Sequence, residues 1–303
     1  MKGRVLSLAL CGALCLTGCS ALLDRPYVMV EPHVEQPVLS EDSSALQVST
    51  YSELVGGVLF LVSQGEETGT IQLIDYRGEV EEDLARACRE VAEEDPLGAY
   101  AVEDIAYSST RVLTTYEAVL EIDYRRTREQ IQSLTGVSST SAIRPAAAVA
   151  LAEHRAELAL RVSYFTGDAG AVVDLVRRAY YDEPASALGL PRYTVALYPD
   201  GSSGSQRVVE VVFTYPERQA VLEERQTQLR ERVEQLLAGL PALPEGESGR
   251  LAWLFSLLSE ARYDPEGGPT AWDALVGDGA DSEGLALTFQ LLAEELEVGA
   301  ALV

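Results

Sequence analysis

The chain has 303 residues, 47% of them hydrophobic, and its 48 acidic residues outnumber 23 basic ones, which gives a net charge of −25. This excess of negative charge repels nucleic acid and anionic lipid head groups, so it excludes binding to either through a basic surface. The hydrophobic content is sufficient for packed cores, and the length allows two or three small domains.

Residues 1–18 have the features of a secretory signal peptide. Lys2 and Arg4 supply positive charge, and the apolar run that follows them is too short to span a bilayer as a mature helix. The run ends in Leu16-Thr17-Gly18-Cys19, which resembles the lipobox of bacterial lipoproteins. The resemblance implies cleavage before Cys19 and attachment of acyl chains such as palmitate to it, which would anchor the mature chain to the membrane. The alternative is an ordinary cleaved signal with an incidental cysteine.

Loss of the signal peptide would leave two cysteines, Cys19 as the lipid attachment site and Cys88. A single thiol cannot form an intrachain disulfide, and no metal-ligand spacing occurs, so we expect no metal and no cofactor. Cys88 lies on the apolar side of a predicted helix, which favours a small buried residue over a reactive thiol. The expected location is extracytoplasmic, at the cell membrane, with the lipid on Cys19 as the anchor.

Residues 19–47 are interpreted as an acidic tether. Three prolines interrupt the segment, and it has neither a helical nor a strand period. A flexible chain of this length has a root-mean-square reach of roughly 30 Å. The tether would therefore separate a folded part from the lipid surface.

The first α+β module is predicted over residues 48–135. Alternating strand patterns and helical periods follow one another in this region. The predicted elements are a helix at 50–63, a strand at 70–76, a helix at 79–93, and strands at 99–107 and 112–124.

The second α+β module is predicted over residues 146–240, after a linker at 136–145 that is rich in Ser, Thr and Gly. The module would end in an amphipathic helix at 216–238, before Gly239 and Pro241. The other predicted elements are a helix at 146–157, a strand at 158–165, a helix at 169–180, and strands at 193–198 and 207–215.

The two modules look like an internal repeat. Tyr76 corresponds to Tyr164, and Tyr124 corresponds to Tyr215. The predicted fold class is therefore α+β, with two repeated βαββ modules and flanking helices. Each module would have a small antiparallel sheet with a helix on one face. No nucleophile, base and orienting group occur together in either module, and such modules are more often spacers or docking units than enzymes.

Two groups of residues in the second module have alternative interpretations. Tyrosines and arginines share its strands, at Tyr193, Tyr198, Arg161 and Arg207, and could form a sugar-stacking face. Core packing or cross-strand pairing of the tyrosines is the more frequent outcome. His154 has no identifiable carboxylate or cysteine partner, so we interpret it as a solvated or hydrogen-bonded helix residue and not as a ligand.

The third region, residues 247–303, contains the run TAWDALV at 270–276, followed by Glu283, Gly284 and Ala286. This pattern resembles the nucleophile segment of the transglutaminase-like superfamily, which has a papain-like fold. The resemblance implies that a helix from Glu247 packs against a second helix at 283–296, which in the family begins at a catalytic cysteine. Ser282 occupies the position of that cysteine in this chain.

The resemblance also implies that this segment is incomplete. In the family a histidine and an aspartate follow the cysteine by several tens of residues, whereas this sequence ends at Val303 and its histidines are His33 and His154. A serine needs a base within hydrogen-bond reach, and the carboxylate of Asp281 beside it would oppose an anion. We therefore expect no catalytic residue, with Ser282 as a vestigial nucleophile position. The loop at 277–281 also lacks the ligand spacing of a calcium-binding EF-hand.

Without the sheet that follows the nucleophile helix in the family, the apolar side chains of Leu287, Phe289, Leu291 and Leu292 need another partner. They would bury against the second module, bury against another chain, or remain poorly covered.

The sequence thus predicts a membrane-anchored envelope lipoprotein that binds or scaffolds without catalysis and carries a pseudo-transglutaminase segment. Its expected partners are the membrane, through the lipid on Cys19, and an envelope protein or a glycan, with no nucleic acid. One alternative is a transglutaminase-like acyltransferase or hydrolase that another chain completes. The other is a fragment of a longer active enzyme.

Overall fold

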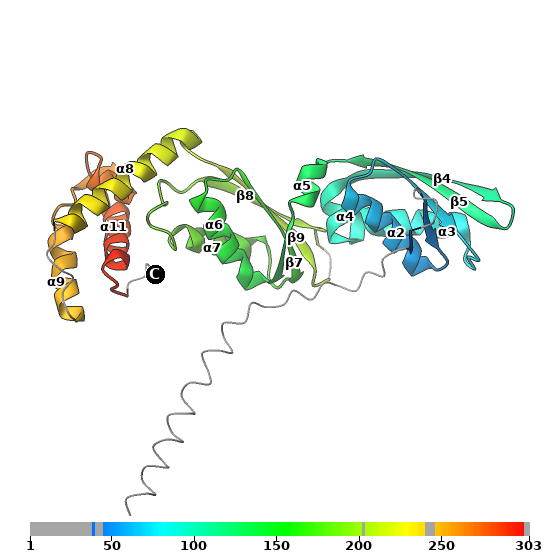
Figure 1. Ribbon diagram of the computed structural model, residues 1–303, viewed down its shortest axis with the longest axis horizontal. Helices are drawn as coiled ribbons and strands as arrows, with labels where there is room; N and C mark the ends of the chain where they lie inside the picture. Colours follow the sequence, from blue (N-terminus) through cyan, green and yellow to red (C-terminus); the bar gives the residue numbers. More distant parts are fainter. Residues whose placement is uncertain (1–37, 40–44, 202–203, 240–245, 300–303) are drawn as a thin grey trace, which may run out of the picture. The chain divides into compact units, whose positions relative to one another are not determined.

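The computed structural model describes residues 38–39, 45–201, 204–239 and 246–299, and it shows a mixed α+β protein (Figure 1). The predicted signal peptide and Cys19 lie outside the described residues. The described part contains two β-sheets, each covered by helices, and a mainly helical C-terminal region.

The first sheet has the strand order β1-β2-β3-β5-β4. Strand β2 runs parallel to β3, and the other neighbouring pairs are antiparallel. Its strands are β1 (Val38–Leu39), β2 (Ala45–Val48), β3 (Thr68–Leu73), β4 (Val102–Val112) and β5 (Thr115–Tyr124). Its helices are α2 (Tyr51–Gln64), α3 (Val80–Arg89), a π-helical turn (Glu90–Glu94) and α4 (Pro96–Ala101).

Helix α2 has local signals at both of its ends. Thr50 and Glu53 form a capping box, in which each side chain accepts a hydrogen bond from the other residue's backbone amide. The helix ends at Gly65, whose φ of 65° is a left-handed conformation that glycine adopts without steric cost. The buried face of α2, which includes Leu54 and Val58, covers the side of the sheet that carries Ile71 and Leu120.

The second sheet has the strand order β6-β7-β9-β8. Strand β6 runs parallel to β7, and the other pairs are antiparallel. The strands are β6 (Thr135–Ser139), β7 (Glu157–Tyr164), β8 (Arg192–Tyr198) and β9 (Arg207–Thr214). The helices near this sheet are a 3₁₀ turn (Thr140–Ala142), α6 (Ile143–Ala152) and α7 (Ala169–Tyr180). The short helix α5 (Arg128–Gln132) precedes β6 and contributes Ile131 to the core of the first sheet.

Several predicted boundaries differ from the observed ones. The predicted tether at 19–47 extends into the first sheet, because Val38–Leu39 and Ala45–Val48 pair as strands. The predicted linker at 136–145 is also structured: Thr135–Ser139 is an edge strand paired with β7, and helix α6 begins at Ile143. Each sheet therefore contains one more parallel strand than a βαββ unit has.

The predicted strand at 99–107 begins too early. Asp95 caps helix α4 by accepting hydrogen bonds from the amides of Leu97 and Gly98, and Pro96 occupies its first turn. Proline at this position needs no amide partner and has a helical φ. The chain therefore stays helical through Ala101, and the strand starts at Val102.

The C-terminal region shares one hydrophobic core with the second module. Leu287 and Leu292 are fully buried, and they belong to one hydrophobic core with Leu160 and Val209 of the sheet. This packing answers the question of what covers the apolar side of the last helix. The elements are α8 (Gln219–Ala238), α9 (Glu247–Leu258), β10 (Tyr263–Gly268), α10 (Ala271–Leu275) and α11 (Ser282–Glu295).

Candidate functional site

Ser282 is the first residue of helix α11, and its side chain is exposed. A nucleophile at a helix N-terminus can use the free backbone amides of the first turn to stabilise an oxyanion. In this chain two of those amides, at Glu283 and Gly284, are already occupied. The carboxylate of Asp281 accepts hydrogen bonds from the amides of Glu283, at 2.9 Å, and Gly284, at 3.0 Å.

The carboxylate of Asp281 therefore performs the role of an N-cap. It also places a negative charge where an oxyanion would form, and like charges repel strongly at short range. Glu283 adds a second carboxylate beside Ser282 and accepts a hydrogen bond from the Tyr181 hydroxyl at 2.9 Å. Burial, with a further contribution from Glu283, raises the pKa of Tyr181 to about 12, so this hydroxyl stays protonated and donates.

The residues that match the family pattern have structural roles around this helix. A Cβ atom on Gly284 would lie 2.7 Å from the carbonyl oxygen of Thr270, so only glycine allows the helix to approach that closely. The Trp272 indole donates a hydrogen bond to Gln228 at 2.9 Å, and the Arg225 guanidinium lies 4.6 Å from the Trp272 ring. These contacts hold the lead-in run against helix α8.

Two hydrogen-bonded contacts attach helix α11 to the end of helix α7. Besides the Tyr181–Glu283 bond, the side-chain amide of Gln290 donates to the Tyr181 carbonyl at 2.9 Å. The first and third turns of α11 thus contact Tyr181, the residue that follows helix α7.

No histidine is brought to Ser282 within the described residues. His154, the one histidine among them, follows helix α6 and lies against Tyr215, with ring centroids 5.7 Å apart. It is 7% exposed, so of the two predicted settings, solvated or hydrogen-bonded, the solvated one was wrong. Its surroundings do not include any member of the Ser282 region.

The mixed tyrosine and arginine strands do not present a shared sugar-stacking face. The Tyr193 hydroxyl donates to the Val173 carbonyl at 3.1 Å, and the ring packs against Phe213 in the core. Tyr198 lies five residues further along the strand, so its side chain points to the other side of the sheet. Arg207 is 7% exposed and donates to the carbonyls of Gly204 and Gln206.

A buried polar cluster forms around Arg126 and Glu210. The Arg126 Nη2 atom lies 2.7 and 2.8 Å from the two carboxylate oxygens of Glu210, and the Tyr198 hydroxyl donates to the same carboxylate at 3.0 Å. The Arg126 guanidinium also lies 4.9 Å from the Tyr100 ring, and the Tyr100 hydroxyl donates to Glu157 at 3.3 Å. The cluster joins side chains of the first and second sheet regions.

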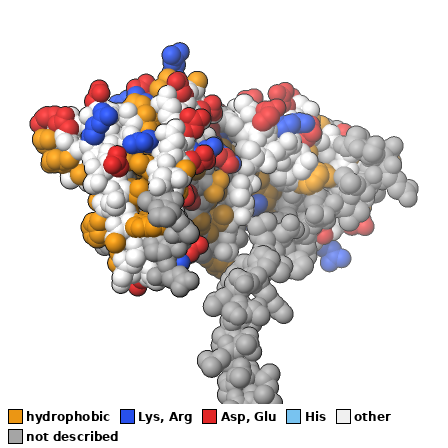
Figure 2. Space-filling view, turned by 60° about the vertical axis from the view of Figure 1, so that its left-hand side comes forward, with side chains coloured by type: hydrophobic (Ala, Val, Ile, Leu, Met, Phe, Trp, Pro, Cys, Tyr) orange, Lys and Arg blue, Asp and Glu red, His pale blue; other side chains and the backbone are white. Residues whose placement is uncertain are grey.

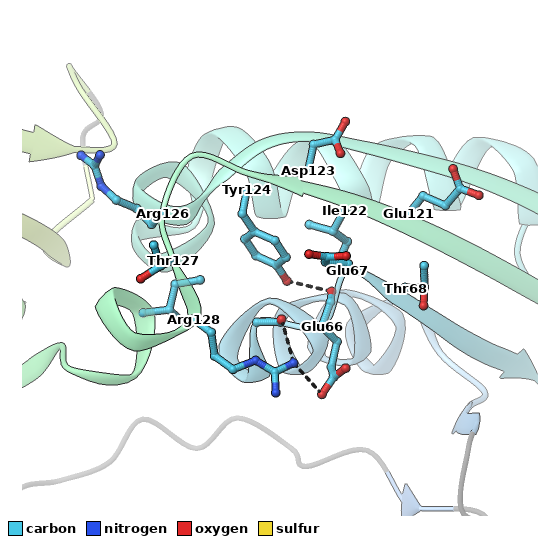
Figure 3. A pocket seen from close by; sticks show the side chains of 12 residues that line it. Glu66, Glu67, Thr68, Glu121, Ile122, Asp123, Tyr124, Arg126, Thr127 and Arg128 are labelled. Atoms are coloured by element: carbon cyan, nitrogen blue, oxygen red, sulfur yellow. Dashed lines mark hydrogen bonds and ion pairs between the residues drawn. The ribbon is translucent and has the colours of Figure 1, made fainter.

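A surface hollow of about 910 Å³ lies beside the turn after helix α2 and the end of strand β5. Figure 3 shows the Tyr124 side chain pointing into it, while Asp123 and Glu121 point to the other side of the strand. The Tyr124 hydroxyl donates to the Glu66 carbonyl at 3.0 Å, and the Arg128 guanidinium lies 3.1 Å from the Glu66 carboxylate. The polar groups of this wall are thus largely paired with one another.

Sequence reasoning missed both the hollow and the polar cluster. A signal for the cluster was nevertheless present, because Glu210 is a lone acid in a row of valines on strand β9. A buried charge is costly without a partner, so an acid in such a row indicates a buried cation nearby. The sequence gives no means of choosing Arg126 from the other arginines.

Cys88 is buried in the first core, as expected for a structural residue. Burial and the negative charge of Asp104 raise the pKa of its thiol to about 12, which keeps it protonated and unreactive. The proposed lipid attachment site, Cys19, cannot be placed because it lies outside the described residues.

Within the described ranges, no group of three or more His, Cys, Asp or Glu side chains is arranged to hold a metal ion. No helix in the same ranges has both the length and the apolar character needed to cross a membrane. No family model matches the chain, and no match occurs among the curated proteins or the solved structures.

Proposed function

We propose that this chain is a membrane-anchored envelope lipoprotein that binds or scaffolds other components and does not catalyse a reaction. The observation that carries the non-catalytic part is the capping of helix α11 by Asp281, which uses the amides that an oxyanion would need. The resemblance to transglutaminase-like proteins then reflects packing, since Gly284 and Trp272 have structural contacts.

The lipobox-like run before Cys19 supports the anchoring part of the proposal. Figure 2 shows acidic side chains recurring across the visible face, with fewer basic ones among them. Removing Lys2 and Arg4 with the signal peptide changes the net charge from −25 to −27. A surface of this kind is repelled by anionic lipids, so attachment would depend on the acyl chains.

The binding or scaffolding part rests on the α+β regions. The strand orders β2-β3-β5-β4 and β6-β7-β9-β8 have the same pattern of parallel and antiparallel pairs, which supports an internal repeat. The repeating unit would then be βαβαββ, with each sheet covered by helices on one side. The hollow beside Tyr124, with a volume of about 910 Å³ and a mainly polar lining, is the proposed contact site for a partner such as an envelope protein or a glycan.

Lipid attachment is tested by expressing the full chain in bacteria that are supplied with alkyne-labelled palmitate. The chain should carry the label and sediment with membranes, and Cys19→Ser should lose the label and become extractable without detergent. Retention of the label by Cys19→Ser would contradict attachment at this residue. Cys88→Ala is the matched control, because its thiol is buried and its loss should leave the label unchanged.

The absence of catalysis is tested by placing a thiol at the nucleophile position. In a Cys88→Ala background, the pKa of the thiol in Ser282→Cys is measured from its rate of reaction with iodoacetamide as the pH is raised. This pKa should be at or above about 8.5, because Asp281 opposes a thiolate. Adding Asp281→Ala should free the amides and lower that pKa. Ser259→Cys, at the C-terminal end of helix α9, is the control without helix amides. A pKa well below 7 in Ser282→Cys alone would favour the enzyme alternative.

A further inference from the structure

Two buried polar atoms near the end of helix α6 have no hydrogen-bond partner among the described residues: His154 Nε2 and Tyr215 Oη. The His154 side chain is more than nine-tenths buried, with 7% of its surface exposed. Its ring and that of Tyr215 meet edge to face at an interplanar angle of 79°. Buried polar atoms in folded proteins are nearly always hydrogen-bonded, either to protein or to an ordered water.

The two atoms share a small cavity. It has a volume of about 10 Å³, and both His154 and Tyr215 line it together with Tyr180, Glu183 and Leu222. A volume of this size corresponds to about one water molecule, which needs two to four polar partners to be held. The cavity is too small for an organic ligand.

The backbone holds the imidazole at this position. Helix α6 ends in a Schellman motif, in which the His154 amide donates to the Leu151 carbonyl and the Arg155 amide donates to the Ala150 carbonyl. This motif gives His154 a φ of 51°, a left-handed conformation that usually belongs to glycine. A histidine kept in this conformation indicates that its side chain contributes contacts that glycine cannot supply.

We propose that the cavity binds a single water molecule that bridges His154 Nε2 and Tyr215 Oη. The water accepts a hydrogen bond from the Tyr215 hydroxyl and donates one to the unprotonated imidazole nitrogen. Tyr180 supplies a third partner: its hydroxyl accepts from the Gly189 amide at 3.0 Å and retains a proton to donate. The bridge links the end of helix α6, the end of helix α7 and the residue that follows strand β9.

The bound water can be detected directly by NMR on the full chain. A water held in this cavity should give cross-peaks between the water resonance and the His154 ring protons in both NOE and ROE spectra. The NOE and ROE cross-peaks should have opposite signs, as they do for a water that stays bound for longer than the protein takes to tumble. The cross-peaks should disappear in Tyr215→Phe, because the water loses one of its partners. Absence of any such cross-peak in the unaltered chain would overturn the proposal.

Stability gives a second test, because a water-filled cavity and a dry cavity predict opposite changes in the unfolding equilibrium constant of Tyr215→Phe. With the water bound, Tyr215→Phe removes a hydrogen bond and should raise the unfolding equilibrium constant roughly tenfold. With the cavity dry, the same change removes an orphaned hydroxyl, and the equilibrium constant should stay the same or fall. Tyr164→Phe is the matched control, because Tyr164 is 68% exposed and should give no change.

A double variant shows whether the two groups act through a common partner. His154→Asn tolerates the left-handed backbone but shortens the side chain beyond reach of the water. If one water joins the pair, the effects of His154→Asn and Tyr215→Phe should be less than additive in the double variant. Full additivity would overturn the bridge even if both single variants were destabilised.

Discussion

Loss of the Glu210 carboxylate should destabilise the chain more than loss of any exposed acid. The Glu210 side chain is 8% exposed and neutralises Arg126, whose side chain is 22% exposed. Removing one partner of a buried ion pair costs about 3–5 kcal/mol, since the other charge is left without compensation. Because Arg126 keeps partial access to water, we expect Glu210→Ala to cost about 3 kcal/mol, near the lower end of that range.

The conservative change Glu210→Gln removes the charge but keeps the shape of the side chain, so it measures how much the charge alone contributes to stability. A side-chain amide can still accept from Arg126 and from Tyr198 but carries no charge, so we expect a cost of about 2 kcal/mol. Urea unfolding measures both changes as a lower transition midpoint at an unchanged m-value. Glu103→Gln is the matched control: Glu103 is 69% exposed and lies 3.6 Å from Arg125, so its change should stay within about 0.5 kcal/mol.

Replacing both Arg126 and Glu210 tests the same ion pair without leaving an unpaired charge. Arg126→Met with Glu210→Met removes both charges and fills a similar volume, so the double variant should be more stable than Glu210→Ala. The role of Glu210 as the partner of a buried charge is refuted if Glu210→Gln costs less than about 0.5 kcal/mol, the level of an exposed pair. It is also refuted if the double variant is no more stable than Glu210→Ala.

Three further predictions concern His154, Leu113 and Cys88. Burial lowers the pKa of His154 below its usual 6.5, despite the opposing charge of Glu223, so the unfolded chain binds this proton more readily than the folded one. The stability that neutral His154 contributes is therefore complete above about pH 6.5, and falls as the pH drops toward the folded pKa. Urea midpoints between pH 7.5 and 5 should show this fall, and in His154→Asn the dependence of the midpoint on pH should be weaker. An equal dependence in His154→Asn would assign the fall to other titrating groups. Leu113 is 90% exposed at a φ of 57°, so Leu113→Gly should relieve about 1 kcal/mol of strain and raise the Tm, whereas a lower Tm would show a packing role. Because burial raises the pKa of Cys88 to about 12, a thiol reagent at pH 8 should label it only as fast as the chain unfolds; rapid labelling under native conditions would contradict its burial.

Long periodic segments of the fold could be predicted from the sequence. The helix expected at 169–180 is observed over the same residues, and the strand at 193–198 differs by one residue. In these segments the hydrophobic period, the Asp168 cap and the tyrosine-rich strand agree with one another.

Edge strands could not be predicted in the same way. Strand β6 (Thr135–Ser139) has neighbours on one side only and carries small polar side chains, so its sequence shows no alternation. Its strand conformation depends on pairing with β7, which is a tertiary interaction. Strand β2 lies between β1 and β3 and is only four residues long, so its conformation also depends on tertiary pairing, and it could not be separated from the predicted tether.

At the candidate site, too, interactions between neighbours in the sequence could be predicted, whereas interactions between distant residues could not. The influence of Asp281 on Ser282 could be inferred, because the two residues are adjacent and a cap acts within one turn. The pairing of Arg126 with Glu210, or of His154 with Tyr215, joins residues that are far apart in the sequence. Such pairs depend on how the sheets and helices pack, which a single sequence does not reveal.

The order of strands in the first sheet has a mechanical consequence. Tension on the chain ahead of Val38 would reach the folded part through β1, which pairs with β2 at two positions. Those pairs would separate first and release slack at low force. The load would then fall on β2, which pairs with β3 at four positions and has Leu46 and Val48 buried in the core. The sheet edge would thus yield in two steps, and the weak first step would protect the core from brief pulls on the chain.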